Sequence, residues 1–192
     1  MEKPTTFGLR PFDAKRDDDE SLAIRARTDP DAFGLLYETH AACVYRYLRA
    51  RGAREDVAEE LTAVAFERAL RRIEQFQPGR SGFRSWLLAI ARNAWVDGHR
   101  RAVPIALLSE ASGLPAVALS PEAAAVATEE RALVMSALSG LPEPTRDALA
   151  LRYGSGLSSR EIAQVIGKSE DATKKLLSRS LVSLREALRH DR

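Results

Sequence analysis

The chain has 192 residues, of which 45% are hydrophobic and 29% are charged, enough apolar material for one large or two small folded domains. Its formal net charge of +2 excludes a general polycation, so binding to an anionic polymer requires basic residues gathered in one place. The single cysteine, Cys43, excludes an internal disulfide framework and a multi-cysteine zinc site, and no apolar run approaches the ~20 residues of a membrane span.

Residues 1–20 are polar, with two prolines and an acidic cluster at 17–20. This composition predicts a disordered acidic arm. The segment has no signal-peptide core, so we expect a cytoplasmic location.

Residues 21–101 are predicted to form a first helical domain. Asp29 followed by Pro30 is a typical helix entry, and apolar residues then recur at helical spacing as far as Gly52. A second helix is expected over about 54–74, and the breaker at 77–82 separates it from a third helix over 82–101.

The helix expected over 82–101 combines an apolar face with a basic and aromatic face. The apolar face consists of Phe83, Leu87, Ile90 and Ala94. The neighbouring face carries Trp86, Asn93, Asp97, Arg100 and Arg101. Rings stack on exposed bases (~1–3 kcal/mol each), amides read base edges and guanidinium groups hold phosphates, so this face is suited to opened single-stranded DNA. A helix on a membrane surface fits less well, and each tryptophan alone is more typical of a core.

The helix expected over 54–74 has the opposite charge. Residues 54–67 contain one basic residue and five acidic ones: Glu55, Asp56, Glu59, Glu60 and Glu67. A surface that faces DNA does not carry such charge. It is either a solvated helix face or a docking surface for a basic protein partner.

Residues 102–128 are expected to form an extended linker. They contain three prolines, one glycine and two charged residues, too few core-forming features for a domain and too apolar a composition for a freely solvated tether. A second helical domain is expected over 129–192, with helices at about 129–140, 142–153, 158–166 and 169–188. No useful strand alternation occurs, so the fold class is predicted to be all-α.

The second domain is predicted to contain a helix-turn-helix. Ser158 and Glu161 have capping-box spacing, and Gly167 suits the left-handed end of a helix. Ala163, four residues before that glycine, permits a close helix crossing. The next helix then presents candidate groove and phosphate contacts: Glu170, Asp171, Lys174, Lys175 and Ser178. The alternative is a pair of packed helices whose lysines are merely solvated.

In this order, the motifs at 56–70, 83–101 and 138–186 resemble the small extracytoplasmic-function (ECF) sigma factors of bacterial RNA polymerase. The resemblance implies that core RNA polymerase is a partner, through the clamp coiled coil of its β′ subunit and through its β subunit. The implied polymerase-binding residues are Asp56, Glu59, Glu60 and Glu67.

The resemblance also implies two promoter contacts and an inhibitor. The implied contacts with the melted minus-ten element are Phe76, Arg80, Trp86, Asn93, Arg100 and Arg101, with the loop at 76–82 and Asn93 capturing a flipped base. The implied contacts with the minus-thirty-five duplex are Arg160, Ser169, Glu170, Asp171, Lys174, Lys175, Ser178 and Arg179. An anti-sigma factor is a further expected partner; no catalytic residue, metal or cofactor is expected.

Three other functions account for less of the sequence. A stand-alone helix-turn-helix regulator accounts for 157–179 but leaves the acidic helix unexplained. A helical enzyme has little support, because His40, His99 and His190 are scattered and no catalytic or phosphate-binding motif occurs. An interaction adaptor without DNA contact does not predict two basic patches.

Overall fold

The computed structural model describes residues 12–101 and 133–190. The elements, in chain order, are α1 (Phe12–Arg25), α2 (Pro30–Ala50), α3 (Glu55–Arg71), the 3-10 turn η1 (Ile73–Gln75), α4 (Phe83–Arg101), a helical segment at 133–139, α6 (Glu143–Leu149), the π-helical η2 (Ala150–Gly154), α7 (Ser159–Ile166) and α8 (Glu170–His190). The described residues contain no strand. The prediction of an all-α fold with two helical parts is confirmed, while the predicted linker at 102–128 lies outside the described residues.

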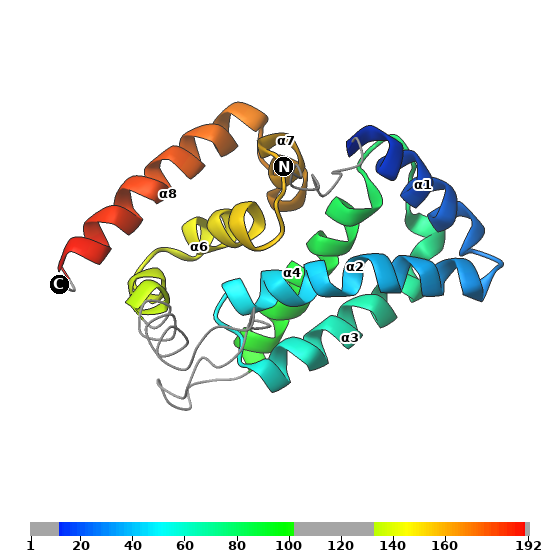
Figure 1. The fold of residues 1–192 in the computed structure, drawn as a ribbon, viewed down its shortest axis with the longest axis horizontal. Helices are drawn as coiled ribbons and strands as arrows, with labels where there is room; N and C mark the ends of the chain where they lie inside the picture. The colour runs from blue at the N-terminus through cyan, green and yellow to red at the C-terminus, as the bar shows by residue number, and fades with distance from the viewer. Residues whose placement is uncertain (1–11, 102–132, 191–192) are drawn as a thin grey trace, which may run out of the picture.

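The first helical part is a bundle of α1 to α4 (Figure 1). Its longest helix, α2, begins where the sequence indicates: the Asp29 carboxylate accepts hydrogen bonds from the amides of Asp31 (3.0 Å) and Ala32 (3.4 Å), and Pro30 occupies the first turn. The predicted apolar face of α4 is buried, with Leu87 fully inaccessible and Phe83 1% exposed. Cys43 is also buried, as expected of a small packing residue.

The predicted disordered arm is wrong from Phe12 onward, because α1 begins there. The acidic cluster is part of this helix, which is stabilised by contact with α2. Ala23 of α1 is fully buried, and Asp19 is 8% exposed with its Oδ2 3.0 Å from Nε2 of His40 on α2. Residues 1–11 lie outside the described range.

The second helical part contains the predicted helix-turn-helix. The Ser158 hydroxyl accepts from the amide of Glu161 (3.3 Å), while the Glu161 carboxylate accepts from the amide of Ser158 (2.8 Å), which completes the capping box. Gly167 ends α7 with a φ of 68°. Ala163 is buried at the crossing, and Thr173 of α8 is fully buried against the rest of the motif.

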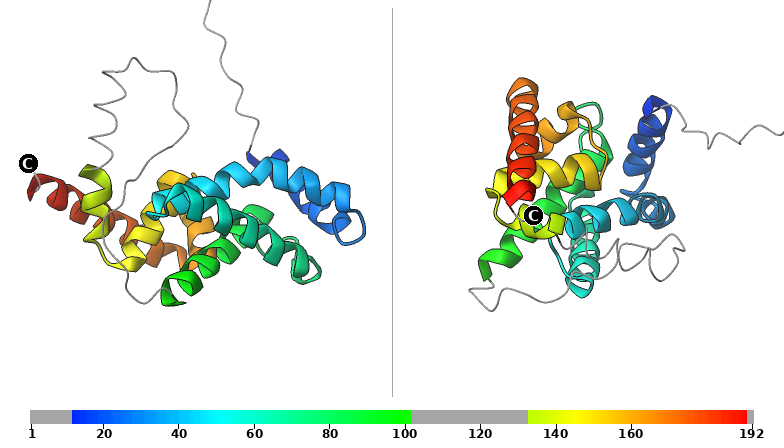
Figure 2. Two further views of the ribbon diagram at one scale, coloured as in Figure 1. Left: turned by 90° about the horizontal axis from the view of Figure 1, so that it is seen from below. Right: turned by 60° about the vertical axis from the view of Figure 1, so that its left-hand side comes forward.

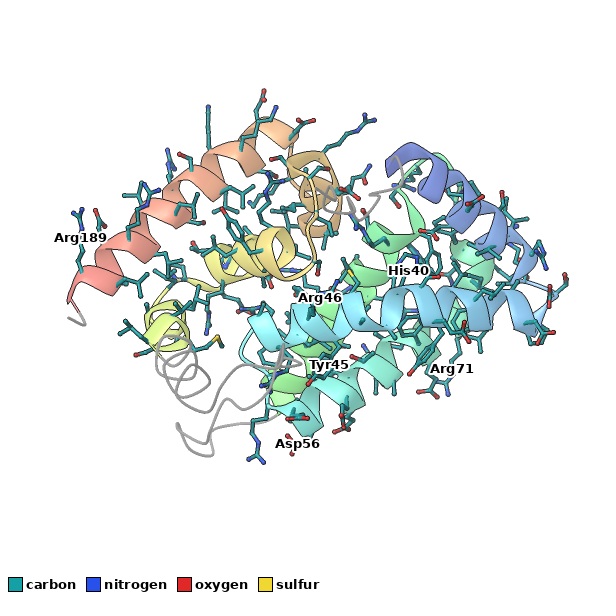
Figure 3. All side chains as sticks on the ribbon, viewed as in Figure 1. His40, Tyr45, Arg46, Asp56, Arg71 and Arg189 are labelled. Carbon is teal, nitrogen blue, oxygen red and sulfur yellow. The ribbon has the colours of Figure 1, made fainter. Side chains whose placement is uncertain are left out.

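The two helical parts contact one another (Figure 2). Gly154 of η2 lies against α2 so closely that an added Cβ would come within 2.9 Å of the Ala50 Cβ. The Arg46 guanidinium, labelled in Figure 3, donates from Nε to the carbonyl of Gly154 (3.3 Å). The lack of a side chain at Gly154 therefore permits the docking of η2 on α2.

Candidate functional site

The predicted acidic docking surface lies on α3. All four of its predicted residues are exposed: Asp56, Glu59, Glu60 and Glu67. Two of them form exposed ion pairs within their own region, since Glu67 contacts Arg71 at 2.6 Å and Asp56 contacts Arg54 at 3.3 Å. Figure 3 shows Asp56 pointing away from the bundle at the start of α3.

Two exposed apolar side chains accompany these carboxylates, and sequence reasoning missed them. Tyr37 of α2 is 45% exposed and packs edge-on against Phe66 of α3, with ring centroids 4.7 Å apart. Leu70, one turn after Phe66, is 47% exposed. Tyr37 recurs at the same helical spacing as the buried residues of α2, so the spacing alone does not reveal that it is exposed. The surface of α2 and α3 is therefore acidic and partly apolar.

The minus-ten prediction for Phe76 needs correction. Phe76 is only 1% exposed, and its ring packs against Phe83 (5.7 Å between centroids) and Trp86 (5.4 Å). A ring so enclosed cannot stack on a base in this conformation. Phe76 is thus the buried anchor of the loop that follows it, and Trp86, half-buried in the same cluster, offers only part of its ring to solvent.

The loop between η1 and α4 is exposed at its tip and held at three backbone positions. Residues 77–80 are all exposed, and Gly79 has a φ of 79°, a conformation that glycine adopts without strain. The Phe76 carbonyl accepts from Arg27 (2.8 Å), the Gly79 amide donates to Glu20 (2.9 Å), and the Arg80 carbonyl accepts from Gln164 (3.1 Å).

Asn93 is exposed on α4, as its prediction requires. It lines a cavity of about 340 Å³ together with Arg92, Asp97 and Glu143. Arg80 is also exposed, while the side chains of Arg100 and Arg101 lie outside the described part of the structure. Asn93 and Arg80 are therefore accessible.

A buried carboxylate from the second helical part holds the basic helix. Asp147 of α6 is fully buried, with one oxygen 2.7 Å from Nε of Arg51 and the other 2.7 Å from Nε of Arg92. The Tyr47 hydroxyl donates to the same carboxylate at 3.0 Å. Burial, together with the negative charge of Asp147, raises the pKa of Tyr47 well above its usual 10.0.

A second interdomain pair involves the helix-turn-helix itself. Arg84 of α4 contacts Glu161 of α7 at 3.1 Å. Two arginines of the helix predicted to hold DNA thus face carboxylates of the other domain. Sequence reasoning could not show that Asp147 and Glu161 lie against this helix.

The eight predicted minus-thirty-five residues are all exposed, along α7, the turn and the first turns of α8: Arg160, Ser169, Glu170, Asp171, Lys174, Lys175, Ser178 and Arg179. The Ser169 hydroxyl accepts from the amide of Ala172 (3.2 Å), so it also caps α8. Glu170 contacts Lys174 at 2.8 Å. This hydrogen bond and its charge lower the pKa of Glu170 and raise that of Lys174.

The described ranges, 12–101 and 133–190, offer neither a candidate metal cluster nor a candidate membrane span. They contain no group of three or more His, Cys, Asp or Glu side chains placed to hold a metal ion. None of their helices is long and apolar enough to cross a bilayer.

The chain matches two family profiles in the order of its two helical parts. Residues 36–103 match Sigma-70 region 2, and residues 131–184 match Sigma-70, region 4. Together the two matches span more than half of the chain.

Curated relatives carry the same description. The chain is 35% identical to the ECF RNA polymerase sigma factor BldN of Streptomyces coelicolor, over 88% of this chain and 66% of BldN. It is 31% identical to the ECF RNA polymerase sigma factor SigE of Mycolicibacterium smegmatis, over 80% of this chain and 60% of SigE. The chain therefore spans slightly less than two thirds of each of these relatives.

A solved structure shares the arrangement of helices. The structure of CnrH in complex with the cytosolic domain of CnrY aligns with a TM-score of 0.71 and 26% identity, covering 92% of this chain and 100% of CnrH. The sigma factor RpoE of Bartonella quintana, solved with the anti-sigma factor NepR, has a TM-score of 0.64 at 22% identity, which indicates a common fold.

Proposed function

The chain belongs to the extracytoplasmic-function sigma factors of bacterial RNA polymerase, and we propose that it directs the core enzyme to a specific set of promoters in the bacterial cytoplasm. Its role is to bind core polymerase, recognise two promoter elements and stabilise melted DNA. One observation carries the proposal. The chain matches both sigma regions, and it exposes an acidic and partly apolar surface and basic side chains on separate helices.

The surface of α2 and α3 is proposed to dock on the clamp coiled coil of the β′ subunit. Its carboxylates, Asp56, Glu59, Glu60 and Glu67, are exposed and complement a basic partner. Tyr37 and Leu70 add the exposed apolar area that protein interfaces bury at their centre. The second helical part is proposed to contact the β subunit.

The exposed loop at 77–80 and Asn93 are proposed to capture a flipped base of the minus-ten element. Phe76 is excluded from direct base contact by its burial and is proposed to anchor that loop. Arg80, Trp86, Arg100 and Arg101 complete the proposed contacts. Extruding a base costs a few kcal/mol, which hydrogen bonds and stacking in the site offset.

The helix-turn-helix is proposed to bind the minus-thirty-five element as duplex. Its exposed lysines Lys174 and Lys175 are proposed to contact phosphates, and the first turn of α8 to face the major groove. Two weak DNA contacts on one chain gain affinity when polymerase fixes their separation.

An anti-sigma factor is proposed as the inhibitor. The structure of CnrH contains the cytosolic domain of CnrY, and the structure of the Bartonella RpoE contains the anti-sigma factor NepR. The two alignments cover 92% and 83% of this chain, respectively. A pull-down from the native cell that recovers polymerase but never a dedicated inhibitor contradicts this part of the proposal.

The test is reconstituted transcription. The full chain is mixed with bacterial core polymerase and a fragmented genomic library, and RNA start sites are read. Discrete start sites with a shared upstream pair of elements are expected. Failure of the purified chain to bind core polymerase at low ionic strength, with no inhibitor present, overturns the proposal; duplex binding without polymerase favours the stand-alone regulator instead.

A further inference from the structure

We propose that α1 positions the minus-ten loop: Glu20 and Arg27 hold residues 76–79 in the conformation that receives the flipped base. This inference rests on the proposed function, because the loop acquires its role from promoter recognition. It gives α1 a part in promoter opening without placing it in contact with DNA.

The first observation is the contact at the tip of the loop. The Gly79 amide donates to Oε2 of Glu20 at 2.9 Å, across 59 positions of sequence. Gly79 is exposed, has a φ of 79° and follows a proline that has no amide hydrogen of its own. A carboxylate from α1 therefore fixes the residue at which the loop turns.

The second observation is the contact at the base of the loop. Nη2 of Arg27, just after α1, donates to the carbonyl of Phe76 at 2.8 Å, and Nε of Arg27 lies 3.7 Å from Glu74. Phe76 is the residue whose buried ring anchors the loop. Glu20 within α1 and Arg27 just after it thus hold the tip and the base of the loop, respectively.

The third observation is that α1 is itself firmly seated. Asp19, next to Glu20, is 8% exposed, and its Oδ2 lies 3.0 Å from Nε2 of His40, which is 3% exposed. The His40 ring in turn packs against Phe83 of the aromatic cluster, with centroids 5.5 Å apart. His40 lies on the side of α2 that faces the other helices (Figure 3). Glu20 is therefore presented from a rigid support.

Rigidity matters because the loop is exposed and contains two glycines, Gly79 and Gly82. A loop free to sample many conformations loses that freedom when a base binds. Because the contacts with Glu20 and Arg27 form when the protein folds, the entropic cost of ordering the loop is not incurred when DNA binds. The expected consequence is a contribution to base capture and selectivity, with none to polymerase docking.

The experiment compares full-length variants with core polymerase. Glu20→Ala removes the acceptor for the Gly79 amide, whereas Glu20→Gln retains an acceptor oxygen. Asp18→Ala is the matched control, an exposed carboxylate of the same helix. Each protein is measured for core affinity, thermal midpoint, open-complex formation by permanganate reactivity, and start-site usage on promoters randomised across the minus-ten element.

Glu20→Ala is expected to lower open-complex formation by about threefold to tenfold, the range for one lost hydrogen bond at an exposed site. It should also broaden the preference at the captured base, with core affinity unchanged. Glu20→Gln and Asp18→Ala should keep the wild-type profile. Arg27→Gln has a side chain too short to donate to the Phe76 carbonyl, so it should reproduce the Glu20→Ala profile. It provides the test if Glu20→Ala does not fold.

Three results overturn the inference. Glu20→Ala can match wild type in opening and base preference. It can lower use of every minus-ten sequence equally along with the thermal midpoint, which marks a structural role alone. Or Glu20→Gln can behave as Glu20→Ala, which shows that the retained acceptor is irrelevant. Failure of the wild-type chain to direct any start site is a different outcome, since it refutes the proposed function and this inference with it.

Discussion

Replacing Asp147 by alanine should separate the two helical parts. The Asp147 side chain is 1% exposed and so is its partner Arg51, with 2.7 Å between the charged atoms. Removing one member of such a buried pair costs about 3–5 kcal/mol, because the other charge stays in a poorly solvated place. Glu143, 3.2 Å from Arg51 and half-exposed, still offers a carboxylate, so the lower figure applies.

The lost stabilisation should appear as separation of the domains, because Asp147 and Arg51 belong to different helical parts. Separation exposes the Arg51 guanidinium to water. A cost of about 3 kcal/mol shifts the docking equilibrium by somewhat more than a hundredfold. Tyr47 and Arg92 lose their partner in the same step.

The assay is single-molecule energy transfer between dyes placed at positions 71 and 189, both occupied by exposed arginines and labelled in Figure 3. Asp147→Ala should move most molecules to a low-transfer population. Asp97→Ala, which breaks the partly exposed pair with Arg68, is the control and should leave the distribution unchanged. Identical distributions for Asp147→Ala and wild type refute the assignment of Asp147 as the main polar contact between the domains.

Three further predictions follow from single contacts. Between neutral pH and pH 11, the free energy of unfolding measured in urea should fall less for Tyr47→Phe than for wild type. Because the pKa of Tyr47 is raised in the folded state, the protonated phenol stabilises the fold fully below about pH 10. This stabilisation is lost as the pH rises through the pKa of Tyr47 in the folded protein. Equal losses contradict this. Glu170→Gln should free Lys174 and raise affinity for the minus-thirty-five duplex, with a steeper salt dependence by up to about one unit, measured by anisotropy; an unchanged slope shows that the lysine makes no phosphate contact. Gly154→Ala should destabilise domain docking by about 1–3 kcal/mol, because its Cβ would lie 2.9 Å from that of Ala50, and the dye pair above should report the separation; an unaltered distribution means that the interface adjusts.

The elements that sequence predicted well depend on neighbours in the chain. The capping box of Ser158 and Glu161, the left-handed Gly167 and the Asp29 cap each satisfy backbone groups within a few positions. Such signals are visible in a single sequence, because the partners are three or four residues apart. The helix-turn-helix and the buried face of α4 were predicted for this reason.

The misses depend on contacts between different elements of the fold. The resemblance placed Phe76 among the contacts with melted DNA, yet Phe83 and Trp86 of α4 bury its ring. The acidic start of α1 had the composition of a disordered arm, but contact between Asp19 and His40, 21 positions later, seats it on α2. Asp147 was one charge among many until the fold placed it against Arg51 and Arg92.

The same interdomain contacts link domain separation to promoter binding. Arg84 and Arg92 of α4 face Glu161 and Asp147 in the docked arrangement, so the positive field of the proposed minus-ten surface is partly neutralised there. Separation of the domains would remove these carboxylates from α4, so we expect it to strengthen the proposed interaction of α4 with DNA. By thermodynamic reciprocity, DNA bound to α4 favours separation by the same factor. A partner that holds the domains apart is therefore expected to increase promoter affinity without making any new contact with DNA.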